Sequence, residues 1–271
     1  MDYLLYSIIG LCMGVVGGTL GIGGAVFMIP AMTLVFGENQ HLYQAAAMIC
    51  IFFVSSASLI AHRKANLISK KTLLGMVPAA LIGIVAGVSM SNSALFEGPK
   101  DYILSRVFGG FLVYVAVYNS FRLYRSMKQG QPQDDGQAPE KKEAQTSLAW
   151  VVGLVTGLGS GLLGMGAGTV ATPLQQLLLK SPMKKAMSNS ATLIVCISWL
   201  GALYKNLTLP EHGLNPIDSL KIAACIIPGA IIGGTIGGHL MHTLPKNIVR
   251  TVFILVCIIA AIKLLTVSPS P

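Results

Sequence analysis

Long apolar runs alternate with short polar segments along the whole chain. A helix of about 20 apolar residues crosses a hydrocarbon core of roughly 30 Å, so each run is long enough to span a membrane. The pattern therefore predicts an all-α integral membrane protein. The runs cover residues 4–36, 42–61, 72–90, 103–121, 148–179, 186–204, 219–240 and 247–266.

The first and fifth runs are too long for one crossing. As a single helix, residues 4–36 would measure about 50 Å at 1.5 Å per residue. Each long run holds a glycine cluster, at residues 21–24 and 164–168. Because glycine and proline interrupt regular backbone, we expect two broken helices, each forming a hairpin that returns to its own side. Glycines spaced four residues apart also suit close helix packing, so we expect helix packing at Gly10, Gly14 and Gly18 of the first arm and chain reversal at residues 21–24.

The chain carries this pattern twice. Six positions of the first long run recur in the fifth at the same spacing, and residues 228–237 of the seventh run correspond to residues 78–87 of the third. We therefore expect two homologous repeats, 1–125 and 147–271. The polar segment 126–146 between them has the composition of a disordered cytoplasmic linker. The recurring positions are Gly10, Gly14, Gly18, Gly21, Gly23 and Pro30, matched by Gly153, Gly157, Gly161, Gly164, Gly166 and Pro173.

The composition excludes a soluble domain. Hydrophobic residues make up 53% of the chain and charged residues 11%, against about a quarter charged in soluble proteins. The net charge of +9 does not indicate nucleic-acid binding, because most Lys and Arg cluster in a few loops beside the runs. An excess of Lys and Arg in the loops on one side orients proteins in the membrane. The pattern therefore predicts a multi-pass protein of the cytoplasmic membrane.

The hairpin arrangement obeys the positive-inside rule better than single crossings do. It places the basic loops at 62–71, 122–146, 180–185 and 241–250 together in the cytoplasm. Each repeat then makes three full crossings, an odd number, so the second repeat is inserted upside down. Inverted repeats with interrupted helices are typical of secondary transporters, whose substrate lies near the membrane midplane.

The ionisable residues give no sign of enzyme chemistry. All ten carboxylates lie outside the runs or at their edges, so the sequence predicts no acidic group and no internal charge in the bilayer. The five cysteines are all in apolar runs without a CxxC pair, and we expect no disulfide, metal or cofactor. Lacking a nucleophile with a base, the chain is not expected to be an enzyme. His239 is the one candidate for proton handling.

The breaks themselves offer chemistry for an anion. A helix that begins inside the membrane, near Gly24 or Gly168, exposes amide N–H groups at the positive end of its dipole. Nearby hydroxyl and amide side chains add donors or serve only as interhelical hydrogen bonds. Gln175 and Gln176 line an entry path or solvate a helix end. The candidate substrate-binding residues are Thr19, Gly21, Gly23, Gly24, Pro30, Gly164, Gly166, Gly168, Thr169, Pro173, Ser188, Asn189, Ser190 and Thr192.

The doubled motif resembles the sulfite exporter TauE/SafE family of membrane permeases. The resemblance rests on residues 14–30 (GVVGGTLGIGGAVFMIP) and 157–173 (GLGSGLLGMGAGTVATP), with residues 186–192 behind the second motif. It implies transport of sulfite or organosulfur anions across the bacterial cytoplasmic membrane. The first repeat lacks the Ser/Asn/Thr cluster of residues 186–192.

The leading hypothesis is an exporter of a small sulfur-containing anion such as sulfite, a sulfonate or sulfoacetate. The alternatives are an anion channel and a permease for another small organic anion. The expected partners are the anionic substrate and the lipid bilayer, with no nucleic acid, and a homodimer is possible.

Overall fold

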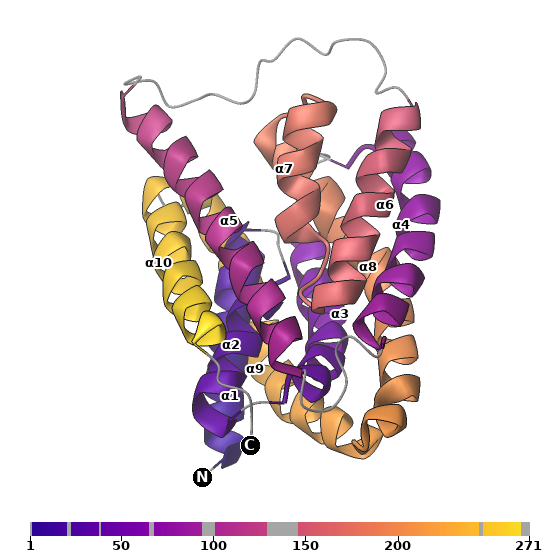
Figure 1. The fold of residues 1–271 in the computed structure, drawn as a ribbon. Coiled ribbons are helices and arrows are strands. Elements are labelled where there is room, and N and C mark those ends of the chain that lie inside the picture. Colours follow the sequence, from indigo (N-terminus) through magenta and orange to yellow (C-terminus); the bar gives the residue numbers. More distant parts are fainter. Residues whose placement is uncertain are drawn as a thin grey trace.

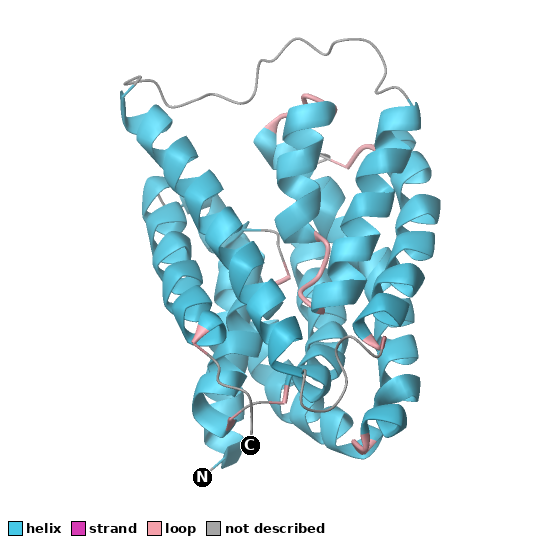
Figure 2. Ribbon diagram, viewed as in Figure 1, coloured by secondary structure: helices cyan, strands magenta, loops and turns pink. Residues whose placement is uncertain are grey.

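The computed structural model of the chain describes residues 2–20, 23–37, 39–64, 68–93, 101–128, 146–243 and 246–266. Those residues are helical throughout apart from short turns, and they contain no strand (Figures 1 and 2). The helices are α1 (Asp2–Leu20), α2 (Ala25–Phe36), α3 (Gln40–Lys64), α4 (Lys70–Ser91), α5 (Asp101–Lys128), α6 (Thr146–Leu163), α7 (Gly168–Leu178), α8 (Met183–Thr208), the 3-10 helix η3 (Leu209–His212), α9 (Pro216–Thr243) and α10 (Lys246–Leu265).

The predicted all-α membrane protein is confirmed. Large apolar side chains such as Leu74, Val117 and Ile262 are exposed on the outside of the bundle, which suits contact with lipid rather than with water. Within the described ranges, five helical segments are long and apolar enough to cross a membrane, namely Gln40–Leu59, Lys70–Ser91, Tyr102–Phe121, Lys185–His212 and Pro216–Leu240.

The first long run is a hairpin, as predicted. Helix α1 ends at Leu20 and α2 begins at Ala25. The Tyr6 ring near the start of α1 stacks on the Phe36 ring at the end of α2, with centroids 4.7 Å apart. At 1.5 Å per residue the two arms measure about 28 and 18 Å, so neither fully spans a hydrocarbon core of roughly 30 Å.

The fifth run is also a hairpin. Helix α6 ends at Leu163, α7 begins at Gly168, and α7 runs back beside α6 (Figure 1). The loop between them lies at mid-height in the bundle, surrounded by helices (Figure 2). Both arms stay close, since a Cβ added at Gly159 would lie 3.4 Å from Val170 Cγ2. The break falls at the predicted residues 164–168.

Glycines join each first arm to a helix of the other half of the chain. Helix α1 packs along α9, and α6 packs along α4. A Cβ added at Gly14 would overlap the Ala230 carbonyl oxygen, and one at Gly157 would overlap the Ala80 carbonyl oxygen. The packing role expected for the glycines of the first arm is thus confirmed, together with the chain reversal. The other glycines in these contacts are Gly10, Gly18, Gly229, Gly233 and Gly237 between α1 and α9, and Gly83, Gly87, Gly153 and Gly161 between α4 and α6.

The registers of the contacts give the helix directions. Helices α1, α9 and α3 run parallel to one another, α3 runs antiparallel to α8, and α8, α4 and α6 run parallel, so α1 and α6 point in opposite directions. Helices α5 and α10 pack together along one side (Figure 1). The deciding contacts of α3, α4 and α8 are Cys50 with Ala223, Val54 with Gly234, His41 with Lys205, Met48 with Gly201, Ser69 with Asn189 and Ser89 with Tyr204.

We name the two ends of the bundle by the chain segments found there. The linker end is where α5 ends and α6 begins, and the terminal end is where α1 begins and α10 ends (Figure 1). Residues 126–128 of the predicted linker are helical, as the last residues of α5. Residues 129–145 lie outside the described part of the chain, so the repeat boundaries stay predictions.

Replacing Gly157 by Ala is expected to lower the free energy of unfolding by about 1–3 kcal/mol, because the new methyl group overlaps the α4 backbone. Thermal or steric-trap unfolding of the purified protein measures the change. Gly110→Ala is the matched control, since nothing lies within 4 Å of a Cβ there, and it should be neutral or stabilise by up to about 1 kcal/mol. Equal losses in both variants would contradict the packing role.

Candidate functional site

Four glycines at the breaks adopt left-handed backbone. The φ angles are +86° at Gly23, +77° at Gly24, +66° at Gly164 and +78° at Gly166. An L side chain at such a φ costs roughly 1–2 kcal/mol, so glycine is what allows each sharp reversal. Gly21, another candidate residue, lies outside the described ranges.

Two helices therefore begin inside the bundle. The Gly24 carbonyl accepts from the Phe27 amide at 2.9 Å, and the Ala167 carbonyl accepts from the Ala171 amide at 2.7 Å. Neither the first turn of α2 nor that of α7 receives a capping hydrogen bond from its N-cap side chain. The leading amides of a helix have no partner inside it, and the dipole makes this end positive.

The candidate prolines occupy matching places in the two short helices. Pro30 is inside α2 and Pro173 is inside α7, each in the second turn. A proline has no N–H, so each one frees the carbonyl of the residue four positions earlier. Pro30 is buried and Pro173 is half-buried. Gly168, the first residue of α7, is buried as well.

Both breaks lie against α3. A Cβ added at Gly23 would lie 2.9 Å from Ile51 Cγ2 and 3.6 Å from Ile194 Cδ1 of α8. A Cβ added at Gly164 would lie 2.5 Å from Gln44 Cγ. Gln44 and Ile51 are separated by two helical turns, about 10 Å. The two glycine turns thus contact the same helix, at positions two turns apart.

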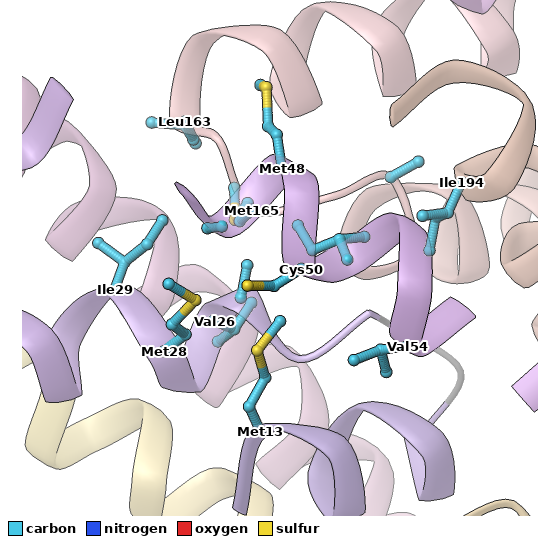
Figure 3. Packing of buried hydrophobic residues seen from close by; sticks show 14 of the residues in the cluster. Met13, Val26, Met28, Ile29, Met48, Cys50, Val54, Leu163, Met165 and Ile194 are labelled. Atoms are coloured by element: carbon cyan, nitrogen blue, oxygen red, sulfur yellow. The ribbon is translucent and has the colours of Figure 1, made fainter. Parts of the chain in front are cut away.

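Apolar side chains fill the space around the breaks. Figure 3 shows methionines of both repeats in one cluster with Val26 and Cys50. Met13, Met28 and Met165 are fully buried, and Val26 is 1% exposed. Methionine is unbranched and flexible, so it fills irregular gaps and repacks at small cost. In this conformation the helix ends are covered by side chains that are able to move.

A polar network joins α7, α8 and the start of α4 at the linker end. Gln175 Nε2 donates to Ser190 Oγ at 3.0 Å, and Asn189 Nδ2 donates to Gln175 Oε1 at 3.2 Å. Thr172 also donates to Ser190 at 3.0 Å, and the Ser69 amide donates to Asn189 Oδ1 at 2.9 Å. The network is buried, and its members satisfy one another.

The other polar candidates bond locally. Thr19 donates to a carbonyl of its own helix at 2.8 Å, Thr169 donates to Met165 Sδ at 3.7 Å, and Thr192 donates to the Ser188 carbonyl at 2.9 Å. The structure therefore brings Asn189 and Ser190 together with α7, and it keeps the threonines within their own turns. A substrate role for these residues stays a prediction.

Gln44 is a residue that the sequence analysis missed. It is fully buried on α3, and its Nε2 donates to the Leu162 carbonyl at 3.3 Å. Ser91 at the end of α4 donates to Gln44 Oε1 at 3.2 Å. A carbonyl in the last turn of a helix has no partner inside that helix, so Gln44 stabilises the end of α6 beside the second break. The sequence feature that could have identified Gln44 is that it is a single glutamine inside the apolar run 42–61.

Lys205 corrects the expectation that the bundle holds no internal charge. The sequence pattern ends the sixth run at residue 204 and leaves Lys205 in a loop, whereas α8 continues to Thr208 and buries Lys205 completely. The apolar pattern of the sixth run stops before the helix does, because polar residues follow Tyr204. His239, the candidate for proton handling, is exposed on α9. Among the described residues, no group of three His, Cys, Asp or Glu could hold a metal.

The sequence profile of the sulfite exporter TauE/SafE family matches residues 6–264, which include both breaks, the polar network around Ser190, and Lys205. The chain belongs to this family. It is a multi-pass membrane protein whose relatives are membrane transporters. The resemblance found in the doubled glycine motif is confirmed.

Several named relatives cover most of the chain. It is 25% identical to the probable membrane transporter protein MamO of Paramagnetospirillum magneticum, over 97% of this chain and 45% of that protein. It is 23% identical to the probable membrane transporter protein YunE of Bacillus subtilis, over 98% of both chains. A probable membrane transporter protein of Methanocaldococcus jannaschii is 28% identical over 77% of this chain and 74% of its own. The chain spans about half the length of MamO, and no solved structure matches it.

Replacing Gln175 by Met is expected to lower the free energy of unfolding by about 1–3 kcal/mol, because Asn189 loses a buried hydrogen-bond acceptor. The unfolding temperature in detergent measures the loss. Gln176→Met is the control, since Gln176 is the neighbouring, half-buried glutamine and should cost less. If the two variants unfold alike, the network at the linker end contributes little stability.

Proposed function

We propose that this protein exports a small sulfur-containing anion, such as sulfite, a sulfonate or sulfoacetate, and binds it near the membrane midplane at the two glycine breaks. The single observation that carries the proposal is the pair of helix N-termini that begin inside the bundle, without side-chain caps, after glycine turns that both lie against helix α3. Amides at a helix N-terminus favour an anion through hydrogen bonds and the dipole. Glycine lets the ligand approach the backbone.

The proposal includes two repeats of opposite orientation. The support is that α1 and α6 point in opposite directions, and that each packs on a helix of the other repeat. Transporters with inverted repeats bind substrate between the repeats and alternate access by moving one against the other. If the linker end faces the cytoplasm, the two arms of the first hairpin start and end on the outer side of the membrane. The arms of the second hairpin start and end on the cytoplasmic side.

The methionines around the breaks act as the movable cover in this mechanism. Met13, Met28 and Met165 are fully buried beside the two glycine turns (Figure 3), so the described conformation corresponds to a closed state. Rearrangement of these flexible side chains exposes the amides to the anion. An anion leaving a negative interior gains roughly 2.3 kcal/mol per charge per 100 mV, which is enough to drive export without proton coupling.

Replacing Gly23 by Leu is expected to reduce transport at least about tenfold, which corresponds to about 1.4 kcal/mol of lost binding. The side chain would fill the place of the anion next to Ile51. Uptake and efflux of labelled sulfite and sulfonates by proteoliposomes measure the effect. Gly166→Leu should behave in the same way.

Gly213→Leu is the matched control. Gly213 also has left-handed backbone, at a φ of +69°, but nothing lies within 4 Å of an added Cβ. This variant carries the same strain and should transport at the wild-type rate. Saturation and counter-exchange indicate a carrier, whereas flux that rises linearly with concentration indicates a channel. Wild-type rates in Gly23→Leu and Gly166→Leu would remove the breaks as binding sites, and wild-type inactivity toward a broad anion panel would remove the function.

A further inference from the structure

Lys205 is fully buried near the end of α8, at the terminal end of the bundle. Its ammonium group donates to His41 Nδ1 at 2.8 Å, to Ser91 Oγ at 2.8 Å and to Asn92 Oδ1 at 2.7 Å. The His212 ring of η3 stacks on the His41 ring with centroids 3.9 Å apart, and its Nε2 lies 3.3 Å from Asn92 Oδ1. We call these five residues the Lys205 cluster.

The cluster lies where α3, α4, α8 and η3 meet. Asn92 follows α4 directly, and its Nδ2 donates to Thr208 Oγ1 at 2.7 Å. Ionisable groups inside the helix bundles of membrane proteins are rare, costly and mostly functional. The cluster lies about one helical turn from the second break, because His41 precedes Gln44 by three residues on α3 and Gln44 lies against Gly164.

We propose that the Lys205 cluster is a second binding site for a small oxyanion with several acceptor oxygens, reached from the terminal end of the bundle. Ser91 Oγ and Asn92 Oδ1 present neutral oxygens to the ammonium group. The oxygens of a sulfite or a sulfonate fit the same donor directions and carry negative charge. Hydrogen bonds between two charged groups are stronger than bonds with one neutral partner, so the anion competes well for Lys205.

Gln40 supplies an independent sign of a missing ligand. It is 3% exposed, and neither its Nε2 nor its Oε1 has a hydrogen-bond partner within the described residues. Buried polar atoms without partners are unusual in folded proteins and call for an explanation. Gln40 precedes His41 and lies one turn before Gln44, on the same face of α3. A bound oxyanion in the cluster provides the acceptor that Gln40 Nε2 lacks.

The cluster is also connected to the second break. Lys205 donates to Ser91, Ser91 donates to Gln44, and Gln44 donates to the Leu162 carbonyl at the end of α6. An anion that replaces Ser91 as the acceptor for Lys205 changes this series of hydrogen bonds. Occupancy of the outer site thus acts on the helix end next to Gly164.

The ligand class rests on the proposed function, and the experiment separates the two. Sulfite and methanesulfonate are titrated onto the purified protein in nanodiscs, and binding is followed by the shift of the unfolding temperature. Lys205→Met should weaken anion binding at least tenfold. Lys221→Met is the matched control, because Lys221 is an exposed lysine near the start of α9, at the same end of the bundle, and it should bind as the wild type does.

Gln40→Leu keeps the test decisive if Lys205→Met fails to fold. Removing a buried amide without partners should leave the unfolding temperature of the anion-free protein unchanged or raised, and it should weaken binding severalfold. Wild-type affinity in folded Lys205→Met, wild-type affinity in Gln40→Leu where Lys205→Met does not fold, or no anion binding by the wild type would overturn the site.

Transport is measured separately on the same proteins. If the wild type exports anions and Lys205→Met binds and exports them equally well, the second site is wrong and the proposed function stands. If the wild type exports none of the panel but binds sulfite in a manner that depends on Lys205, the second site stands and the proposed function fails.

Discussion

Close contact between glycine-lined helices from the two halves of the chain is the constraint on which the rest of this structure depends. Lipid chains are as apolar as leucine, so helices in a membrane associate through packing and hydrogen bonds. Each broken run provides only short arms, and one arm of each is held along a full-length helix by backbone contacts at residues such as Gly14 and Gly157. Without these contacts, neither half-helix has a fixed position, and the breaks have no defined place beside α3.

As a result, the backbone amide groups at the two breaks lie among apolar side chains. The glycine turns that lead into α2 and α7 lie beside Ile51 and Gln44 of the same helix, under a cover of methionines. The polar residues around Ser190 satisfy one another instead of facing an open cavity. In this family member, the strongest polar groups therefore lie toward the two ends of the bundle, and flexible apolar side chains fill the middle.

Much of the architecture could be predicted from sequence because its special features are local. Left-handed backbone at Gly23 and Gly166 favours glycine through local sterics alone, so the breaks were visible as a doubled glycine pattern. The pairing of α1 with α9 was not visible, because stripes of small residues on several helices fit one another equally well. Lys205 and Gln44 were missed for a related reason: whether a polar residue in an apolar run is buried depends on partners such as Ser91, which lie far away in sequence.

The packing of α1 on α9 and of α6 on α4 also sets the order in which helix contacts form during biosynthesis. When α6 leaves the ribosome, its partner α4 has already been made, so that contact can form at once. Helix α1 is made before α6, yet its partner α9 follows α1 by more than 200 residues, about 10–40 seconds at ordinary rates of translation. During that interval the glycine face of α1 must be sheltered by lipid or by the insertion machinery. The α1–α2 hairpin is thus synthesised before α6 and completes its packing on α9 later than α6 does on α4.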